Sequence, residues 1–277
     1  LSCTPSQRRM WTLEKLLPGS PRYNIANTFQ LQGELDNQRL IAALTATVAH
    51  HAMLHTVYGE SDRGLQPVPL AEHRVNVLQK NLSQMPLVQA LEQAKTLSSA
   101  FQRQPFELSS NVPFGVQIIT VAPTLHLVDI KTHHIAADGS MELLVEEISF
   151  RYNRTHAPIQ SCRSYNDYAQ YLLTPSLQME QEKSLQWWQM ALANPPELLR
   201  LPFDKPTKRS TTGVGQLLSI TVDQETVRAL LKLCQQHQGS LFHGLLAVTW
   251  AFLGKLSESD DVLLALPVHT RPSEYVR

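Results

Sequence analysis

The sequence lacks an excess of charge of either sign. Its 277 residues include 24 lysines and arginines and 24 aspartates and glutamates, so the formal net charge is zero. A protein that binds nucleic acid needs a surplus of basic side chains to neutralise the phosphates. We therefore expect no nucleic-acid partner.

Cysteine is also scarce. The three cysteines, Cys3, Cys162 and Cys234, are odd in number and far apart in the sequence. This usage is typical of a reducing compartment and not of a disulfide framework, so we expect a cytoplasmic protein. The 11 histidines form no cluster with cysteine at the spacing of zinc ligands, so we expect no bound metal.

Long apolar runs are missing as well. No basic flank followed by an apolar stretch is visible at the N-terminus, so a signal peptide is not predicted. The most apolar stretch, residues 241–256, is interrupted by His243 and Lys255 and is short for a membrane span. We expect a buried core helix there, and no membrane partner.

Segments with strand and helix patterns are interspersed along the chain, which predicts an α/β or α+β fold. In the first part, the patterns predict strands over residues 29–32, 54–58, 116–121 and 125–132. Helical spacing of apolar residues predicts helices that follow Asp36 and Pro86 and one that contains Met141.

A second region starts near Arg163 and begins with helices, in which we expect Trp187 and Trp188 to lie in the core. A connection with glycines at Gly213 and Gly215 follows. The remaining patterns predict a strand over residues 217–222, helices from Asp223 and from Ser240, and a strand over residues 262–268. Two strands are too few to close a sheet of ordinary size, so this region looks unfinished.

Two adjacent histidines end the strand predicted over residues 125–132. Because side chains alternate along a strand, His134 shares the apolar face with Val128 and Ile130, and His133 lies on the other face with Asp129. An imidazole at a strand end can exchange a proton near neutral pH, and the start of the following helix can stabilise negative charge. Alternatively, His134 is a hydrogen-bonded core residue; adjacent strand histidines are poorly placed to share a metal.

The order of the motifs points to a family. Residues 133–139 resemble the HHxxxDG motif of the condensation-domain superfamily, which includes chloramphenicol-acetyltransferase-like enzymes. Residues 1–11 resemble the opening LSxxQxRxW motif of the same family, with one extra residue. Further segments that are similar to family motifs are residues 31–36, 165–169, 201–206, 260–262 and 267–271. The resemblance covers essentially the whole chain and identifies it as similar to a nonribosomal peptide synthetase condensation domain.

The resemblance implies two chloramphenicol-acetyltransferase-like α/β lobes in a V arrangement, with a tunnel between them. We expect residues 1–162 to form the N-terminal lobe that contains the HHxxxDG motif. Residues 163–277 are expected to form a linker and part of the C-terminal lobe. Since the family continues beyond the motif that ends at Arg271, the resemblance also implies that this lobe is incomplete, and that the chain is a fragment with little activity alone.

The resemblance further implies an amide-forming acyltransferase. A donor acyl or peptidyl thioester and an acceptor aminoacyl thioester would arrive on the phosphopantetheine arms of carrier proteins, beside adjacent synthetase domains, with no permanently bound cofactor. By motif position His134 is the catalytic histidine, Asp138 is a structural acid, and Gly139 lets its backbone approach the reacting carbonyl. His133 is expected to be structural.

One position departs from the family pattern. The arginine that pairs with the motif aspartate is replaced by His55, so we expect charged His55 or another nearby cation to pair with a buried Asp138. Two other functions stay open: a stand-alone acyltransferase with a free acceptor, and a non-catalytic domain that docks carriers. The intact His134, Asp138 and Gly139 favour catalysis, whereas His55 and the expected truncation favour the non-catalytic alternative.

Overall fold

The computed structural model describes residues 3–62, 64–71, 75–153, 164–202 and 218–267. These residues form two compact units, one up to Gln178 and the other from Met179 onwards. The division predicted after residue 162 falls among residues outside the described ranges and stays a prediction. Other expectations also concern residues outside the described ranges and stay predictions: those for Cys162, for the connection around Gly213 and Gly215, and for the motif segments 203–206 and 268–271.

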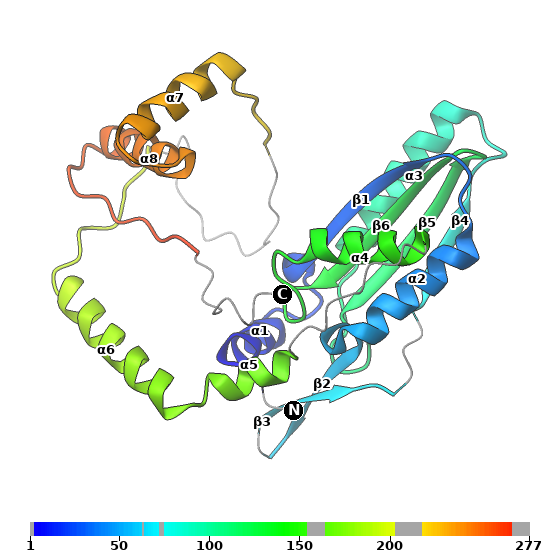
Figure 1. Ribbon diagram of the computed structural model, residues 1–277, viewed down its shortest axis with the longest axis horizontal. Coiled ribbons are helices and arrows are strands. Elements are labelled where there is room, and N and C mark those ends of the chain that lie inside the picture. The colour runs from blue at the N-terminus through cyan, green and yellow to red at the C-terminus, as the bar shows by residue number, and fades with distance from the viewer. Residues whose placement is uncertain (1–2, 63, 72–74, 154–163, 203–217, 268–277) are drawn as a thin grey trace. The chain divides into compact units, whose positions relative to one another are not determined.

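A four-stranded sheet is the centre of the first unit (Figure 1). Its strand order is β1 (Asn24–Gln32), β6 (Leu125–His133), β5 (Phe114–Ala122) and β4 (Val77–Asn81). The β1–β6 and β5–β6 pairs are antiparallel, and β4 runs parallel to β5. The register pairs Asn24 with His133, so the beginning of β1 lies beside the end of β6.

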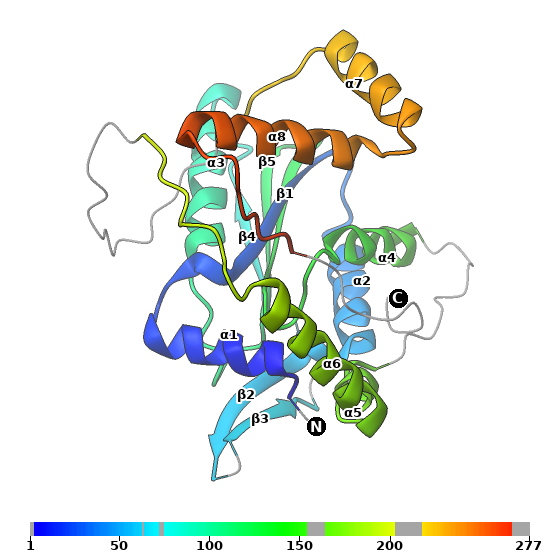
Figure 2. The same cartoon turned by 90° about the vertical axis from the view of Figure 1, so that its left-hand side faces the viewer.

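Helices cover both faces of this sheet (Figures 1 and 2). On one face, α2 (Asn37–His50) and α4 (Met141–Asn153) bury Leu44, Leu144 and Ile148 against Val116 and Ile130. On the other face, α3 (Leu87–Arg103) packs Ala90 and Ala94 against Ile119 and Val121. The alternation of side chains along β5 and β6 supplies both apolar surfaces.

A smaller cluster forms around α1 (Pro5–Leu16) and the hairpin of β2 (Thr56–Ser61) and β3 (Gly64–Pro69). Thr4 caps α1 in a capping box with Gln7. Trp11 then packs with Tyr58, Leu108 and Ile135, and Ile135 belongs to the loop after β6. The short helix α5 (Tyr165–Tyr171) is tied to this region by a hydrogen bond between the Tyr165 hydroxyl and Thr4 Oγ1 at 3.1 Å.

The second unit consists, in its described part, of helices and irregular segments. After α6 (Pro175–Ala191), which begins in the first unit, come α7 (Gln224–Gln236) and α8 (Leu241–Ser257). The last two helices pack closely, since a Cβ added at Gly244 would overlap Cys234 Sγ. No single helix in the described ranges is long and apolar enough to span a membrane; α7 and α8 meet that test only as a pair, bent by 102°.

Most predicted elements of the first part are confirmed, including the Asp36 N-cap of α2, the helix after Pro86 and the β5–β6 pair. The strand predicted from residue 54 is wrong in its start, because residues Ala52–His55 form a 3-10 turn and β2 begins at Thr56. The strands predicted over 217–222 and 262–268 are also wrong within the described residues 218–222 and 262–267. An extended segment becomes a strand only when a neighbour supplies hydrogen bonds, and none of the described residues does so for these two segments.

Two expectations about the second region fail in the described part of the chain. The buried core helix expected over 241–256 is the helix α8, but Gly244 is its one buried residue. Trp187 and Trp188, expected in the core, are 57% and 54% exposed on α6. The apolar periodicity correctly predicts a helix, whereas burial depends on partners that helical spacing cannot identify.

Candidate active site

The HHxxxDG loop leaves the sheet at the end of β6. Backbone hydrogen bonds fix its start: the His133 N–H donates to Pro113 O at 3.1 Å, and the His134 N–H donates to Tyr23 O at 2.8 Å. The chain then turns, with the Ala136 N–H donating back to His133 O at 2.9 Å. Both histidine backbones are therefore held by the residues that directly precede β5 and β1, and the loop that follows them leads directly into α4.

His133 is enclosed by the first unit, with 1% of its side chain exposed. Its Nδ1 accepts the Ile135 N–H at 3.1 Å, which places the proton of the neutral ring on Nε2. That atom faces Glu14 Oε2 of α1 at 3.5 Å. Desolvation, with a smaller contribution from neighbouring His134, lowers the pKa of His133 to about 4. We therefore regard the contact with Glu14 as one between a neutral imidazole and a carboxyl group, although its distance would also suit an ion pair.

The Glu14 carboxyl group that faces His133 also has a shifted pKa. Burial, together with the nearby charge of Glu107, raises the pKa of the Glu14 carboxyl group. The ring of His133 also makes edge contacts with Tyr23 and Phe106, whose centroids lie 6.0 and 6.1 Å away. The His133 ring is thus buried in packing contacts and hydrogen-bonded at Nδ1, whereas its Nε2 has no hydrogen-bond partner among the described residues.

His134 has a different environment, with 34% of its side chain exposed. Its Nε2 lies 3.8 Å from Asp138 Oδ1, which is too long for a hydrogen bond but close enough for a weak electrostatic contact. The imidazole can therefore be reached from outside the sheet. Of the two adjacent histidines, His134 is the one whose side chain is partly exposed.

Asp138 and Gly139 form the turn before α4. The Asp138 side chain is 72% exposed, and its backbone oxygen accepts a hydrogen bond from the Ser140 hydroxyl at 3.0 Å. Gly139 has a φ of +61°, the left-handed region that favours glycine. Nothing lies within 4 Å of a Cβ built at this glycine, so its backbone faces open space.

The structure does not bring His55 to Asp138. His55 is buried beside β2, and its Nδ1 lies 3.1 Å from Leu70 O. Among the described residues, the ion pair of Asp138 is formed with His134 instead. The expectation of a buried Asp138 that needs a cation is corrected here, because this carboxylate lies on an exposed turn where water solvates it.

Sequence reasoning missed Glu14 and a second histidine cluster. Glu14 follows Trp11 by three residues on the same side of α1, a signal that becomes visible once the capping box at Thr4 predicts a helix. His50 and His51 at the end of α2 both contact Glu147 of α4, and the three side chains could hold a metal ion. Their pairing joins two segments that are distant in sequence, which no local pattern reveals.

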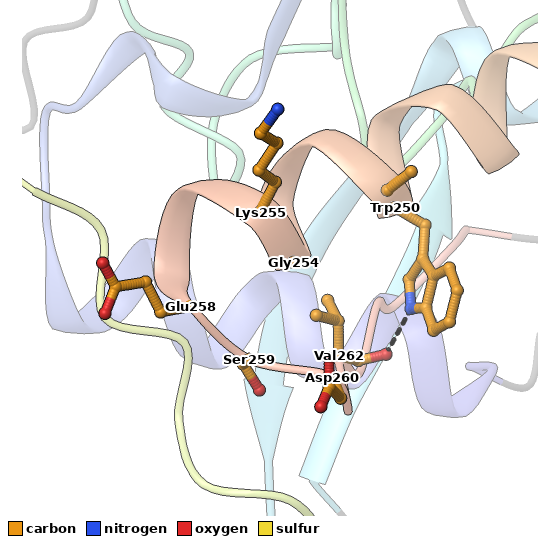
Figure 3. A pocket seen from close by; sticks show the side chains of 8 residues that line it. Trp250, Gly254, Lys255, Glu258, Ser259, Asp260 and Val262 are labelled. Carbon is orange, nitrogen blue, oxygen red and sulfur yellow. Dashed lines mark hydrogen bonds between the residues drawn. The ribbon is translucent and has the colours of Figure 1, made fainter.

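A hollow in the second unit is a separate feature. Trp250, Lys255, Glu258 and Asp260 are among its lining residues, and the Trp250 indole N–H donates to Val262 O at 2.8 Å (Figure 3). None of the predicted site residues lines it. The candidate active site is therefore the HHxxxDG loop of the first unit and not this hollow.

Comparison with known proteins gives the class of this chain. Residues 1–277 match the condensation-domain family, to which the chain belongs. One of the plipastatin synthase subunits of Bacillus subtilis (strain 168) is 30% identical over 271 residues, which cover 96% of this chain and 10% of that protein. One of the linear gramicidin synthase subunits of Brevibacillus parabrevis is 29% identical over 277 residues, or 96% of this chain and 5% of that protein.

Solved structures agree on the fold. The starter condensation domain of rhizomide synthetase RzmA superposes with a TM-score of 0.71 at 20% identity, over 98% of this chain and 62% of that chain. The first condensation domain of the calcium-dependent antibiotic synthetase gives 0.71 at 21% identity, over 94% of this chain and 62% of that chain. The predicted resemblance and the mixed α/β, chloramphenicol-acetyltransferase-like fold are therefore confirmed, and the chain is a condensation domain of the nonribosomal peptide synthetase type.

Proposed function

We propose that this chain provides the His134 loop for amide formation between a carrier-bound acyl or peptidyl donor and the amine of a carrier-bound acceptor. The single observation that supports this most directly is the difference in environment between two adjacent histidines. His133 is neutral, buried and hydrogen-bonded, whereas His134 presents a third of its side chain outside the sheet. A catalytic imidazole must reach its substrate, and His134 meets that requirement.

The reaction forms one bond and breaks another. The acceptor amine adds to the thioester carbonyl carbon, the C–N bond forms, and the C–S bond then breaks as the amine loses a proton and the departing thiolate gains one. An α-amino group has a pKa of about 8, so part of it is already neutral near pH 7. His134 therefore acts mainly by orienting the amine and removing its proton late in the reaction.

The neighbours of His134 have supporting roles. Asp138 places a carboxylate oxygen 3.8 Å from Nε2 of the imidazole. The left-handed backbone of Gly139 leaves the turn free of a side chain where the carbonyl oxygen of the donor would approach. His133 fixes the loop by its bond to the Ile135 N–H and its contact with Glu14.

The substrates and partners follow from family membership and stay proposals for this chain. The chain spans a tenth or less of the first curated relatives, which are synthetase subunits, and between about half and three fifths of the solved condensation-domain chains. A mutant of the RzmA starter domain is solved with C8-CoA and Leu-SNAC. These relatives support donor and acceptor groups delivered on phosphopantetheine by carrier proteins.

The test compares His134→Ala with His237→Ala in the full-length protein. Donor and acceptor are loaded onto carriers, and the product is identified by mass spectrometry. We expect His134→Ala to lower the rate by a factor on the order of 10²–10⁴, the usual contribution of a positioned acid or base. His237 lies at the exposed C-terminal end of α7, so its replacement is the matched control.

Each outcome has a defined meaning. Near-normal product formation by folded His134→Ala would contradict the catalytic assignment. Turnover with a free acceptor, and none with a carrier-bound one, would replace the condensation reaction by a stand-alone acyltransferase. Carrier binding by the unsubstituted protein without any turnover would favour a docking domain.

A further inference from the structure

A second group of reactive side chains lies between α2 and α4, which pack side by side (Figure 1). The last residue of α2 is His50, and His51 follows it directly. His51 Nε2 is 2.7 Å from Glu147 Oε2, and His50 Nδ1 is 3.3 Å from the same oxygen. His50 Nδ1 is also 3.1 Å from Glu147 Oε1, so two imidazole nitrogens converge on one carboxylate group.

Arg151 holds the other oxygen of Glu147. Its Nε and Nη2 donate to Oε1 at 2.8 and 2.7 Å, one helical turn further along α4. Partial burial would raise the pKa of Glu147, but hydrogen bonds from His51 and Arg151 outweigh it and hold the pKa below its usual value. The carboxylate is therefore ionised at neutral pH, and its Oε2 is aimed at the histidines.

The spacing of the donors resembles that of metal ligands. The three donor atoms lie within 4.8 Å of one another. Zinc bonds of about 2.0–2.1 Å in a tetrahedron place ligand atoms roughly 3.3 Å apart, which is the present separation of His50 Nδ1 and Glu147 Oε2. His51 Nε2, now 2.7 Å from Glu147 Oε2, needs to move away from that oxygen. Both histidines are about a quarter exposed, so their rings are free to adjust and water has access.

We propose that His50, His51 and Glu147 bind a divalent transition-metal ion, with zinc as the preferred ion, and thereby join α2 to α4. Two imidazoles and one carboxylate are the donors that suit zinc and not the oxygen-seeking magnesium or calcium ions. Arg151 orients the carboxylate from behind, as hydrogen-bonding partners of a ligating carboxylate do in metal sites. The site is independent of the function proposed for His134.

The position of the ion gives it a structural role. α4 begins at Met141, two residues after Gly139, so its packing against α2 fixes the end of the HHxxxDG loop. Without an ion, the same three side chains hold one another by hydrogen bonds. An ion replaces those bonds by stronger ones and stabilises the folded form, because the unfolded chain does not bring the ligands together.

Calorimetric titration of the metal-free 277-residue protein with Zn²⁺ tests the site. We expect saturable binding of one equivalent, and a loss of affinity of at least about tenfold in His51→Ala and in Glu147→Gln. His237→Ala, which removes an exposed histidine from α7, should bind as the unsubstituted protein does. Affinity should also fall at acidic pH, since protons compete with the metal ion for the ligand atoms.

Absence of saturable binding, or undiminished affinity in both substituted proteins, would overturn the proposal. Circular dichroism of the metal-free variants shows whether they are folded. If they are not, Co²⁺ bound to the unsubstituted protein decides the matter. Intense visible absorption, as low-coordinate cobalt gives, supports an ion bound by protein ligands. The weak spectrum of hydrated cobalt overturns the proposal.

Discussion

Replacing His133 with asparagine separates the titration of this residue from its hydrogen bond. In the folded protein His133 Nδ1 accepts the Ile135 N–H at 3.1 Å. An asparagine oxygen occupies a similar position and accepts the same hydrogen bond, but the side chain does not titrate. The His133→Asn protein should therefore keep the loop while losing the pH response of the imidazole.

The size of that response follows from burial. Desolvation lowers the pKa of His133 from 6.5 to about 4 in the folded protein, whereas unfolding returns it to its ordinary value. Between these two pKa values the unfolded chain binds a proton at His133 that the folded chain does not. The contribution of His133 to the free energy of unfolding is therefore highest above pH 6.5 and falls as the pH drops towards 4. The difference in pKa corresponds to roughly 3 kcal/mol.

Urea unfolding at a series of pH values measures this effect. At pH 7 we expect His133→Asn to be less stable by about 1–3 kcal/mol, because the smaller side chain loses the contacts of the ring with Tyr23 and Phe106. Its stability should then fall less steeply with decreasing pH. The raised pKa of Glu14 acts in the opposite sense, since it favours the folded state at low pH, so the comparison between proteins is what isolates His133.

A matched variant and a direct titration complete the experiment. His237→Asn, on an exposed residue, should keep the full pH dependence. NMR should place the pKa of His133 near 4 and its proton on Nε2. A pKa of His133 above 6.5 would make it an ion-pair partner of Glu14, and equal pH slopes of all three proteins would mean that its pKa does not change on folding. Either result refutes the reasoning.

Two further substitutions test the turn before α4. Asp138→Asn should change the free energy of unfolding, measured with urea at pH 7, by less than about 0.5 kcal/mol, because the carboxylate is exposed and 3.8 Å from His134. A loss of several kcal/mol would mean that this carboxylate is buried and paired. Gly139→Ala should lower the free energy of unfolding by about 1 kcal/mol because of the left-handed φ of +61°, and Gly139→Asn should lower it less. Thermal unfolding measures both, and equal stability of the two variants and the unsubstituted protein would show that the turn has another conformation.

The sequence predicts the helices of this protein better than its strands. The caps at Asp223 and Ser240 locate α7 and α8, because a helix makes its hydrogen bonds within its own segment. The extended segments 218–222 and 262–267 have strand-like composition but no pairing in the described residues. In contrast, the prediction of β5 and β6 is confirmed, since a short turn joins them and each supplies the partner of the other.

The candidate site is predictable in its centre but not in its surroundings. Residues 133–139 identify the loop, and strand alternation places His133 and His134 on opposite faces. The burial that keeps His133 neutral is not visible in the motif, and neither is Glu14, which reaches its ring from α1. The exposure of Asp138 is equally hidden from sequence reasoning, because a motif fixes residue types and not how far the following turn departs from the sheet.

The register of β6 also explains why His133 and His134 cannot exchange their environments. Their backbones are adjacent, but the period of two along a strand sends one ring towards α1 and leaves the other at the outer side of the loop. Exchanging them would need a shift of β6 by one residue against β1, which would also move Val128 and Ile130 out of the core beneath α2 and α4. Burial of these apolar residues, at about 25 cal/mol for each Å² removed from water, fixes the register. The hydrophobic core of the first unit thus fixes which of the two histidines is buried and leaves His134 as the partly exposed one.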